Sequence, residues 1–463
     1  MNLSNRVAAF LVGLDADSIP SHVMEKTRTC LFNSYGIGVG CLDTPYAPVA
    51  RQAALAMYGE RDAGGATLLG DGRRTSSPGA ALANAALFHG RAQEDTCGAA
   101  HLGTILVPLL TAMIEADCYP ADRILPALLA GYEAGGLFEQ AYADRTTPGG
   151  IRSSALYGPI AAAAGAAKLM GLSVAQTAAA LANAASFAGG TLQSFADGTD
   201  EWRYQVGVAA QTGLCAARLA QAGSVSAPYA FEGRAGLVKA YARVDGATQD
   251  VNALSARLGR EWSVLRVTFK PYPVCAFNQT PVTAALALRD QLAGVSMQQV
   301  RSVTVRMNPY ETGYAGMDAT GPFDSVSGTL MSIPFCIANT LLYGIPDMKA
   351  MTVYDDPAVT ALIPKITLVS DAAVAKLCCV IDLRLDDGRS LVREQQMTTD
   401  DYAYDRAGVR SLVARVGKES GIPGQVYARL ERFVDDPGHV GIAEVTACFA
   451  EAALAAGMAG VAA

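Results

Sequence analysis

The chain has 463 residues, about three times the usual length of one domain, so we expect two domains or one large domain with an insertion. Apolar residues make up 51% and charged residues 17%, which excludes intrinsic disorder and indicates a folded, largely helical protein. The net charge of −7, without any basic run, argues against a general nucleic-acid surface or an anionic-membrane surface.

The cysteines and the N-terminal segment give information about the cellular compartment of the protein. Ten cysteines are scattered without repeated spacing, so neither a disulfide framework nor a CxxC metal pair is predicted. The N-terminal residues lack a basic region and reach Asp15 and Asp17 before any long apolar run, which argues against a secretory signal. The apolar stretches 104–114 and 159–172 are too short to span a membrane or are interrupted by other residues. We therefore expect a cytoplasmic protein with no membrane span.

Helical spacing dominates the first part of the chain. Up to about residue 265, apolar residues recur with a period near 3.6, as in residues 124–132, which predicts a helix bundle. Residues 160–170 and 174–187 are so rich in alanine that their helices can pack closely on several sides. We expect these two helices to lie at the centre of the bundle.

The pattern changes after Trp262. Residues 303–308 and 381–386 alternate apolar and polar side chains, which predicts half-buried strands, and Asp387-Gly388 predicts a hairpin turn. Two helices are expected nearby, at residues 280–292 and 330–343. This part of the chain therefore reads as an α+β unit.

From Tyr402 onward the pattern is helical again. The predicted fold is mostly α with an inserted α+β domain. The predicted boundaries are 1–265 for the first part of a helical domain, 266–397 for the α+β domain, and 398–463 for the return to the helical domain.

The chain offers no clear cofactor motif. It lacks a GxxxxGK[ST] phosphate loop, and the alternating glycines of residues 36–40 (GIGVG) follow helical sequence, so close helix packing explains them better than a dinucleotide loop. None of the four histidines pairs with another at metal-ligand spacing on a helix face. We predict neither a nucleotide nor a metal.

Two segments combine titratable residues with local rigidity. Residues 88–104 place His101 among small residues just before an apolar helix, where a ligand has room to bind; an incidental His in a capping loop is the alternative. Thr96, in the same segment, can either cap a helix or bind a ligand. Residues 269–275 hold Lys270 in a proline-stiffened apolar loop, and an exposed linker Lys is the alternative.

Several segments in order resemble one known family. They are Gly131–Glu133, Lys168–Leu172, Gly207–Gly213, Phe231–Gly233, Lys270–Cys275 and Ser332–Ala338. Together they are similar to the MmgE/PrpD family, which includes 2-methylcitrate dehydratase, cis-aconitate decarboxylase and iminodisuccinate epimerase. The resemblance runs from about residue 25 to 435. It implies a discontinuous helical domain, a smaller α+β domain, an active site between them and a homodimer.

The chain departs from the lyase members of that family at several positions. Those members usually carry LDFDDxH where residues 92–96 read AQEDT, and KRLH where residues 202–205 read WRYQ. One of their histidines corresponds to Arg152 and one of their tyrosines to Phe335. The residues that remain are Thr96, His101, Arg203 and Lys270.

These losses favour an epimerase. A dehydratase needs a base for the proton alpha to a carboxylate and an acid for the departing hydroxyl, whereas an epimerase needs only two proton-transfer groups and cations for the carboxylate. We predict a cofactor-independent epimerase of a small polycarboxylic amino or imino acid such as iminodisuccinate. His101 and Lys270 transfer protons, and Arg152 and Arg203 bind carboxylates, so that Lys variants of the two arginines mainly raise KM.

Other interpretations stay open. A hydro-lyase or decarboxylase acting on a tricarboxylate is the main alternative, and a non-catalytic carboxylate-binding protein is a third. Thr96, Tyr157, Tyr204 and Tyr272 are further candidates for substrate contact, although each tyrosine also fits a packing role. Cys97 is either a thiol base or a small buried residue.

Overall fold

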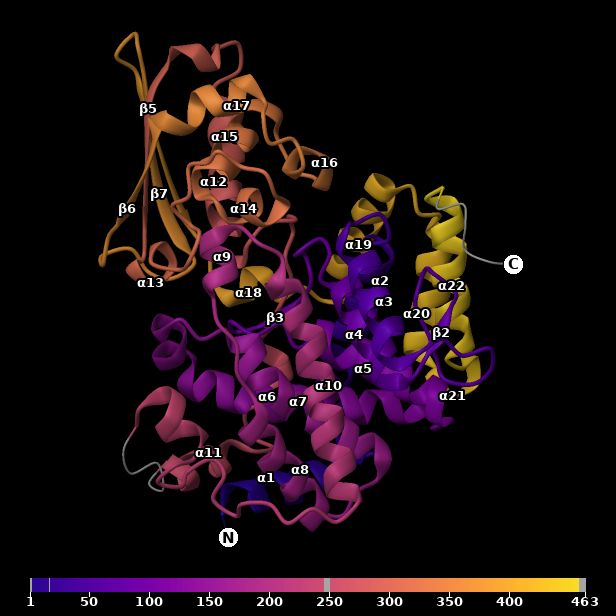
Figure 1. The fold of residues 1–463 in the computed structure, drawn as a ribbon. Helices are drawn as coiled ribbons and strands as arrows, with labels where there is room; N and C mark the ends of the chain where they lie inside the picture. The colour runs from indigo at the N-terminus through magenta and orange to yellow at the C-terminus, as the bar shows by residue number, and fades with distance from the viewer. Residues whose placement is uncertain (1, 16, 245–249, 458–463) are drawn as a thin grey trace.

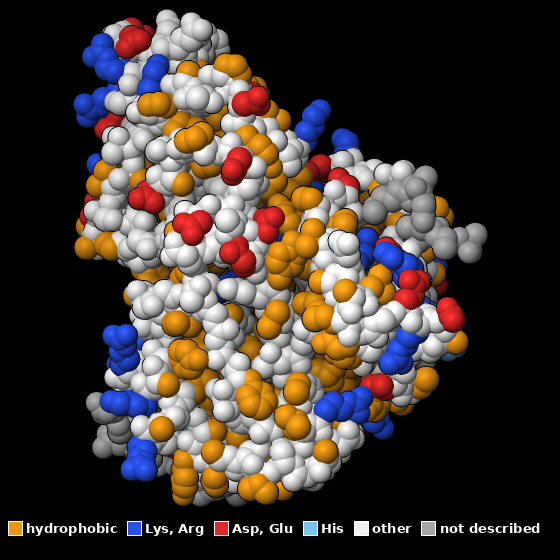
Figure 2. All heavy atoms as spheres, in the orientation of Figure 1, with side chains coloured by type: hydrophobic (Ala, Val, Ile, Leu, Met, Phe, Trp, Pro, Cys, Tyr) orange, Lys and Arg blue, Asp and Glu red, His pale blue; other side chains and the backbone are white. Residues whose placement is uncertain are grey.

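The computed structural model describes residues 2–15, 17–244 and 250–457. Figure 1 shows a large helical part and a smaller part that carries the main sheet. The predicted fold class, mostly α with a smaller α+β unit, is confirmed. None of the described helices combines the length and the apolarity needed to cross a bilayer. On the face drawn in Figure 2, lysine and arginine side chains lie mainly around the edge and form no single basic patch.

One hydrophobic cluster fills the helical part. It contains side chains from Leu3 to Phe269 and again from Val409 to Ala453. Its longer helices are α1 (Leu3–Val12), α2 (Ser21–Val39), α3 (Tyr46–Tyr58), α4 (Ser77–Phe88), α5 (Gly103–Asp117), α6 (Ile124–Thr146), α7 (Ser153–Met170), α8 (Val174–Phe187), α10 (Glu201–Gln221), α19 (Arg406–Ser420), α20 (Gly424–Asp435) and α22 (Ala443–Ala455). Shorter helices are α9 (Gln193–Asp197), α11 (Asp250–Arg257), α18 (Thr399–Tyr402) and α21 (Pro437–Val440).

The alanine-rich helix α7 lies at the centre, as the composition predicted. It packs against α5, α6, α8 and α10, and almost all of its side chains are buried. Small residues allow this close packing because they let helix backbones approach from several sides. The predicted helix at 174–187 matches α8.

The returning C-terminal helices cover α2. Helices α19 and α20 both pack against it, although nearly 400 residues separate them along the chain. A Cβ atom added at Gly36 of α2 would lie 2.5 Å from Val413 Cγ1, so only glycine permits this contact. The glycines of residues 36–40 therefore serve helix packing, as the sequence indicated.

A second hydrophobic cluster fills the α+β part. The sheet has the strand order β6-β5-β7-β8, formed by β5 (Val300–Met307), β6 (Ile366–Ser370), β7 (Cys378–Leu385) and β8 (Ser390–Gln396). The central strand β5 runs parallel to β6 and antiparallel to β7. The helices here are α12 (Gln279–Gln291), α13 (Pro309–Thr312), α14 (Val326–Met331), α15 (Ile333–Tyr343), α16 (Met348–Met351) and α17 (Pro357–Leu362).

The sequence predicted most of this unit correctly. The alternating residues of β5 and β7 bury one face, and Gly388 turns the chain into β8 with a positive φ of 92°. The single helix predicted at 330–343 is wrong, because Ser332 is extended and separates α14 from α15. Pro334 explains the break, because it has no backbone N–H and its ring would clash with the Leu330 carbonyl in a continuous helix, whereas it suits the first turn of a new helix.

Two very short strands connect the parts. β3 (Thr96–Cys97) follows the loop after α4, and β4 (Val267–Thr268) leads into the α+β part. They pair antiparallel, with Thr96 opposite Thr268. Another short pair, β1 (Ala66–Thr67) with β2 (Arg74–Thr75), lies beside α4.

Candidate active site

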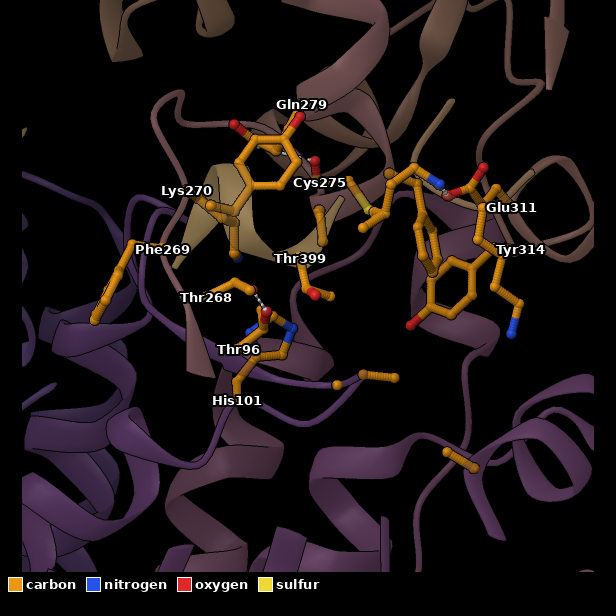
Figure 3. Close-up of a pocket in the computed structure, with 18 of the residues that line it drawn as sticks. Thr96, His101, Thr268, Phe269, Lys270, Cys275, Gln279, Glu311, Tyr314 and Thr399 are labelled. Atoms are coloured by element: carbon orange, nitrogen blue, oxygen red, sulfur yellow. Dashed lines mark hydrogen bonds between the residues drawn. The ribbon is translucent and has the colours of Figure 1, made fainter. Parts of the chain in front are cut away.

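A cavity of about 530 Å³ lies where the two parts meet, beside β3 and β4. Its side chains come from the loop around β3, from β4 and the residues after it, and from the α+β part, as Figure 3 shows. His101 and Tyr314 stand on opposite sides of the open space in that view. Three predicted site residues line this cavity: Thr96, His101 and Lys270.

Glu94 is the centre of the charged network at the cavity. Its carboxylate is 1% exposed and lies 2.6 Å from Lys270 Nζ and 2.9 Å from His101 Nδ1 through the same oxygen, Oε1. Its other oxygen, Oε2, lies 3.2 Å from His89 Nδ1. One buried acid therefore contacts both residues that the sequence assigned to proton transfer.

Glu94 is ionised in this setting. Burial on its own raises the pKa of a carboxyl group, but the neighbouring His89, Lys270 and His101 outweigh it and hold the pKa of Glu94 well below its usual range. Lys270 is the neighbour with the shortest contact, 2.6 Å from Nζ to Oε1. A carboxylate in this position can orient a histidine and balance a lysine at the same time.

His101 has the form of a general base. Burial, followed by repulsion from Lys270, lowers the pKa of His101 to about 4, so the ring is neutral at physiological pH. Because Nδ1 faces the ionised Glu94, we assign the ring proton to Nδ1. Nε2 then carries the lone pair, and it has no hydrogen-bond partner among the described residues.

The lowered pKa of His101 predicts an unusual pH profile. If neutral His101 is the active form, kcat/KM of the free enzyme should stay constant as the pH falls through 6.5 and decline only near about 4. The measurement is kcat/KM from pH 3.5 to 8, within the range where circular dichroism shows a folded protein. A decline centred near 6.5, the ordinary value for histidine, would contradict this assignment.

Lys270 is held in place as a cation. Its Nζ donates to Glu94 Oε1 at 2.6 Å and to the carbonyl of Ala92 at 2.5 Å. An ammonium bound by a carboxylate and a carbonyl stabilises negative charge or donates a proton, and it does not act as the base. Lys270 follows closely after β4, and Thr268, Phe269 and Lys270 all line the cavity.

Thr96 and Thr268 join the two short strands beside this network. Their hydroxyl oxygens lie 2.9 Å apart, and either can be the donor. Both side chains line the cavity, so each hydroxyl retains hydrogen-bonding capacity toward a ligand.

The structure does not bring Arg152 and Arg203 to the cavity wall. Trp202 lines the cavity, and both guanidinium groups lie against its ring, at 5.7 and 4.1 Å from the ring centre. Both arginines are almost fully buried. The indole therefore stands at the wall, with the two predicted carboxylate-binding residues packed against it and outside the lining.

Arg152 acts on the network through His89. Its Nη2 lies 2.8 Å from His89 Nε2, and because arginine only donates, this ring nitrogen must accept. The proton of His89 is thereby placed on Nδ1, which faces Glu94. Burial lowers the pKa of Arg152 to about 10, which still leaves the guanidinium charged at neutral pH. Arg152 thus positions groups that position His101.

Arg203 holds backbone rather than a ligand. Its Nη1 donates to the carbonyls of His89 and Gly90, both at 2.7 Å, and its guanidinium lies over the ring of Tyr46 at 3.7 Å from the ring centre. The His89–Gly90 turn begins the loop that carries Glu94. A planar, multiply bonded guanidinium is poorly replaced by an ammonium at such a site.

From this position we expect Arg203→Lys to lower stability. The loss of one carbonyl hydrogen bond and of the ring stacking should cost about 2 kcal/mol and lower Tm, with little change in KM. Calorimetry and steady-state kinetics measure the two quantities. Arg257→Lys, at a surface pair with Glu261, is the control and should leave Tm unchanged. A raised KM at unchanged Tm would instead support a direct contact with substrate.

The predicted tyrosines lie outside the cavity lining. Tyr157 is buried and its hydroxyl lies 2.9 Å from Thr146 Oγ1, Tyr204 packs beside the α3–α4 region, and Tyr272 bonds through its backbone to Gln279. Cys97 is buried, and burial raises the pKa of its thiol to about 12, as for a small packing residue.

Sequence reasoning did not select several residues that line the cavity. The set comprises Glu94, Arg266, Cys275, Gln279, Glu311 and Tyr314. Glu94 had a signal, because it lies in the segment that takes the place of the acidic family motif. Arg266 lies in the turn that leads into β4, and no sequence pattern pointed to it. No sequence pattern indicated Tyr314 and Glu311, since only folding brings residues 311–314 to the cavity that β3 also lines.

The chain was compared with known families. The N-terminal domain of the MmgE/PrpD family matches residues 5–250, and its C-terminal domain matches residues 272–402. The chain belongs to the MmgE/PrpD family. The two matches together cover most of the chain, and β4 and Lys270 lie in the segment 251–271 between them.

Two similar curated proteins come from Aspergillus species. The chain is 26% identical to the cis-aconitate decarboxylase-like protein oryM of Aspergillus oryzae, over 84% of this chain and 85% of that protein. It is 24% identical to the cis-aconitate decarboxylase of Aspergillus terreus, over 79% of this chain and 78% of that protein. These similar proteins carry the names of decarboxylases and not of epimerases.

Proposed function

We propose that this MmgE/PrpD protein is a lyase that transfers a proton at the carbon beside a carboxylate of a small di- or tricarboxylic acid. The observation that carries the proposal is the contact of one buried carboxylate, Glu94, with both Lys270 and His101. The names of the similar fungal proteins support a decarboxylase or a related lyase.

The residues divide the chemistry in a defined way. In a dehydration, His101 Nε2 takes the alpha proton, the electron pair forms the new double bond, and the hydroxyl leaves as water after it gains a proton. Lys270 stabilises the negative charge that develops on the carboxylate. In a decarboxylation of an unsaturated acid, the bond to the departing carboxylate breaks, CO₂ leaves, the double bond shifts, and the Lys270 ammonium protonates the far carbon.

Tyr314 is the candidate for the second acid of the dehydration. Burial raises the pKa of its phenol well above the ordinary value, so it stays protonated and can donate. Its hydroxyl has no hydrogen-bond partner among the described residues, and it faces His101 across the cavity in Figure 3. A base and an acid on opposite walls fit proton transfer at two faces of one substrate.

Because His101 and Tyr314 lie on opposite walls, an epimerase is the second candidate function. There His101 removes the alpha proton of an imino or amino acid such as iminodisuccinate, and Tyr314 returns one to the other face. Arg152 and Arg203, which favoured this activity in the sequence, lie outside the cavity lining, so their role as carboxylate ligands adds no support. We therefore rank the lyase first.

Proton NMR in D₂O separates the two reactions. The purified protein is incubated with cis-aconitate, citrate, methylcitrate, iminodisuccinate and aspartate derivatives. For the lyase we expect vinyl resonances to appear or to shift, with CO₂ or water released. Loss of an alpha-proton signal without any change in vinyl resonances would support the epimerase. No spectral change with any of these acids would count against both.

A further inference from the structure

The cavity has two chemically different walls. Glu94, Thr96, His101, Thr268 and Lys270 form the polar wall around β3 and β4. On the other side, α9, α10 and the α+β part supply aromatic rings, and the α+β part also supplies the charged Glu311 and Lys376. Proton transfer requires only the polar wall and Tyr314, so the other aromatic rings need a separate explanation.

The aromatic wall is a continuous series of rings. Neighbouring ring centres are separated by 5.1 Å for Trp202 and Phe195, 5.8 Å for Phe195 and Tyr314, 5.1 Å for Tyr314 and Phe277, and 5.9 Å for Phe277 and Tyr310. All five rings line the cavity. Such spacing fixes the rings against one another, so they form a rigid apolar surface.

The cavity is also larger than a small polyacid needs. Its volume of about 530 Å³ falls in the range that receives drug-sized ligands, about 300–1,000 Å³. Leu330, Met331 and Leu377 extend the apolar surface beyond the rings. Binding a small, highly charged acid alone would leave much of this surface against water, which contributes nothing to affinity.

The charges at the cavity do not favour a highly charged anion. Each cation of the lining is already paired with a carboxylate: Lys270 with Glu94 at 2.6 Å, Arg266 with Glu139 at 3.2 Å, and Lys376 with Asp144 at 2.8 Å. Glu311 and Asp400 line the cavity as well. The described lining therefore holds no surplus of positive charge, and apolar contact must supply part of the binding free energy.

We propose that the substrate carries an alkyl or aryl substituent of several carbon atoms beside its carboxylates, and that the wall of Trp202, Phe195, Tyr314, Phe277 and Tyr310 binds this substituent. The inference rests on the proposed function for the position of the reacting carbon. The polar wall orients the carboxylate end at His101 and Lys270, and the aromatic wall selects among acids by the hydrocarbon part.

Non-reacting ligands test the inference without turnover. Calorimetric titration of the whole protein with succinate, 2-methylsuccinate, 2-butylsuccinate, 2-benzylsuccinate and tricarballylate gives a Kd for each. Since a buried methylene changes Kd about fourfold, 2-butylsuccinate should bind up to roughly 60-fold more tightly than 2-methylsuccinate. We expect tricarballylate, which has more charge and no substituent, to bind more weakly than 2-butylsuccinate.

Two variants show where the substituent binds. Phe277→Ala should reduce the gain from methyl to butyl at least fivefold, while Phe187→Ala, at an exposed ring outside this cavity, should leave it unchanged. A Kd independent of chain length in the unaltered protein, or an unchanged gain in folded Phe277→Ala, would overturn the inference and leave the proposed function standing. If neither tricarballylate nor any succinate binds, the proposed function fails too.

Discussion

Replacing His101 by Asn is expected to lower turnover by about 100-fold or more while Tm stays nearly unchanged. His101 is the neutral group at the cavity whose free nitrogen can take a proton, and its other nitrogen is held 2.9 Å from Glu94. Asn keeps a polar side chain next to Glu94 but offers no comparable base. Turnover is measured on the substrate that the NMR panel identifies, and Tm by calorimetry.

A matched histidine variant separates chemistry from general disturbance. His439→Asn alters an exposed residue of α21, remote from the cavity lining, and should leave turnover and Tm unchanged. Full activity in His101→Asn would refute the assignment of His101 as the base. A large drop in Tm would show a structural role instead.

Replacing Glu94 by Gln should damage both activity and stability. The amide carries no charge, so the Lys270 ammonium loses its ionic partner in a buried position, and breaking a buried pair in this way costs about 3–5 kcal/mol. The same change removes the charge that orients His101, so turnover should fall at least 100-fold. Calorimetry and the turnover assay with the same substrate report the two effects.

A double variant distinguishes the two losses. In Glu94→Gln/Lys270→Met the buried ammonium is removed together with its ionic partner, so stability should recover in part while activity stays low. Glu133→Gln serves as the control, because Glu133 is a buried carboxyl that accepts from the backbone N–H groups of Ser263 and Val264 and lies outside the lining. An unchanged Tm in Glu94→Gln would contradict the ion pair as described.

Local pattern was sufficient to predict much of the fold. Alternation identified β5 and β7, the Asp387-Gly388 turn identified the hairpin, and alanine content identified α7 as a central helix. Strand β6 was not predicted, because only Ile366 of its five residues is buried and the alternation that marks a half-buried strand is missing. The helix predicted at 330–343 is divided at Ser332, because Pro334 cannot donate to the Leu330 carbonyl as a continuous helix requires.

Residues of the candidate site could be predicted only where they lie in short segments of characteristic composition. Thr96, His101 and Lys270 stand in segments of characteristic composition, and the folded chain brings all three to one cavity. Arg152 and Arg203 stand in equally characteristic segments, but their side chains pack against Trp202 outside the lining. The sequence gives the charge of each residue, but the direction in which a side chain on a helix points depends on its neighbours in the fold.

The sequence by itself determined the family, the mostly helical class with an α+β unit and the presence of a histidine and a lysine suited to acid–base chemistry. Only the tertiary structure showed that Glu94 contacts both of these residues and that five aromatic rings line the same cavity. Periodicity and composition are local properties that can be read from the sequence without knowledge of the fold. The protonation of a buried group depends on distances between residues as far apart in the chain as Glu94 and Lys270, 176 positions, and only the folded chain sets those distances.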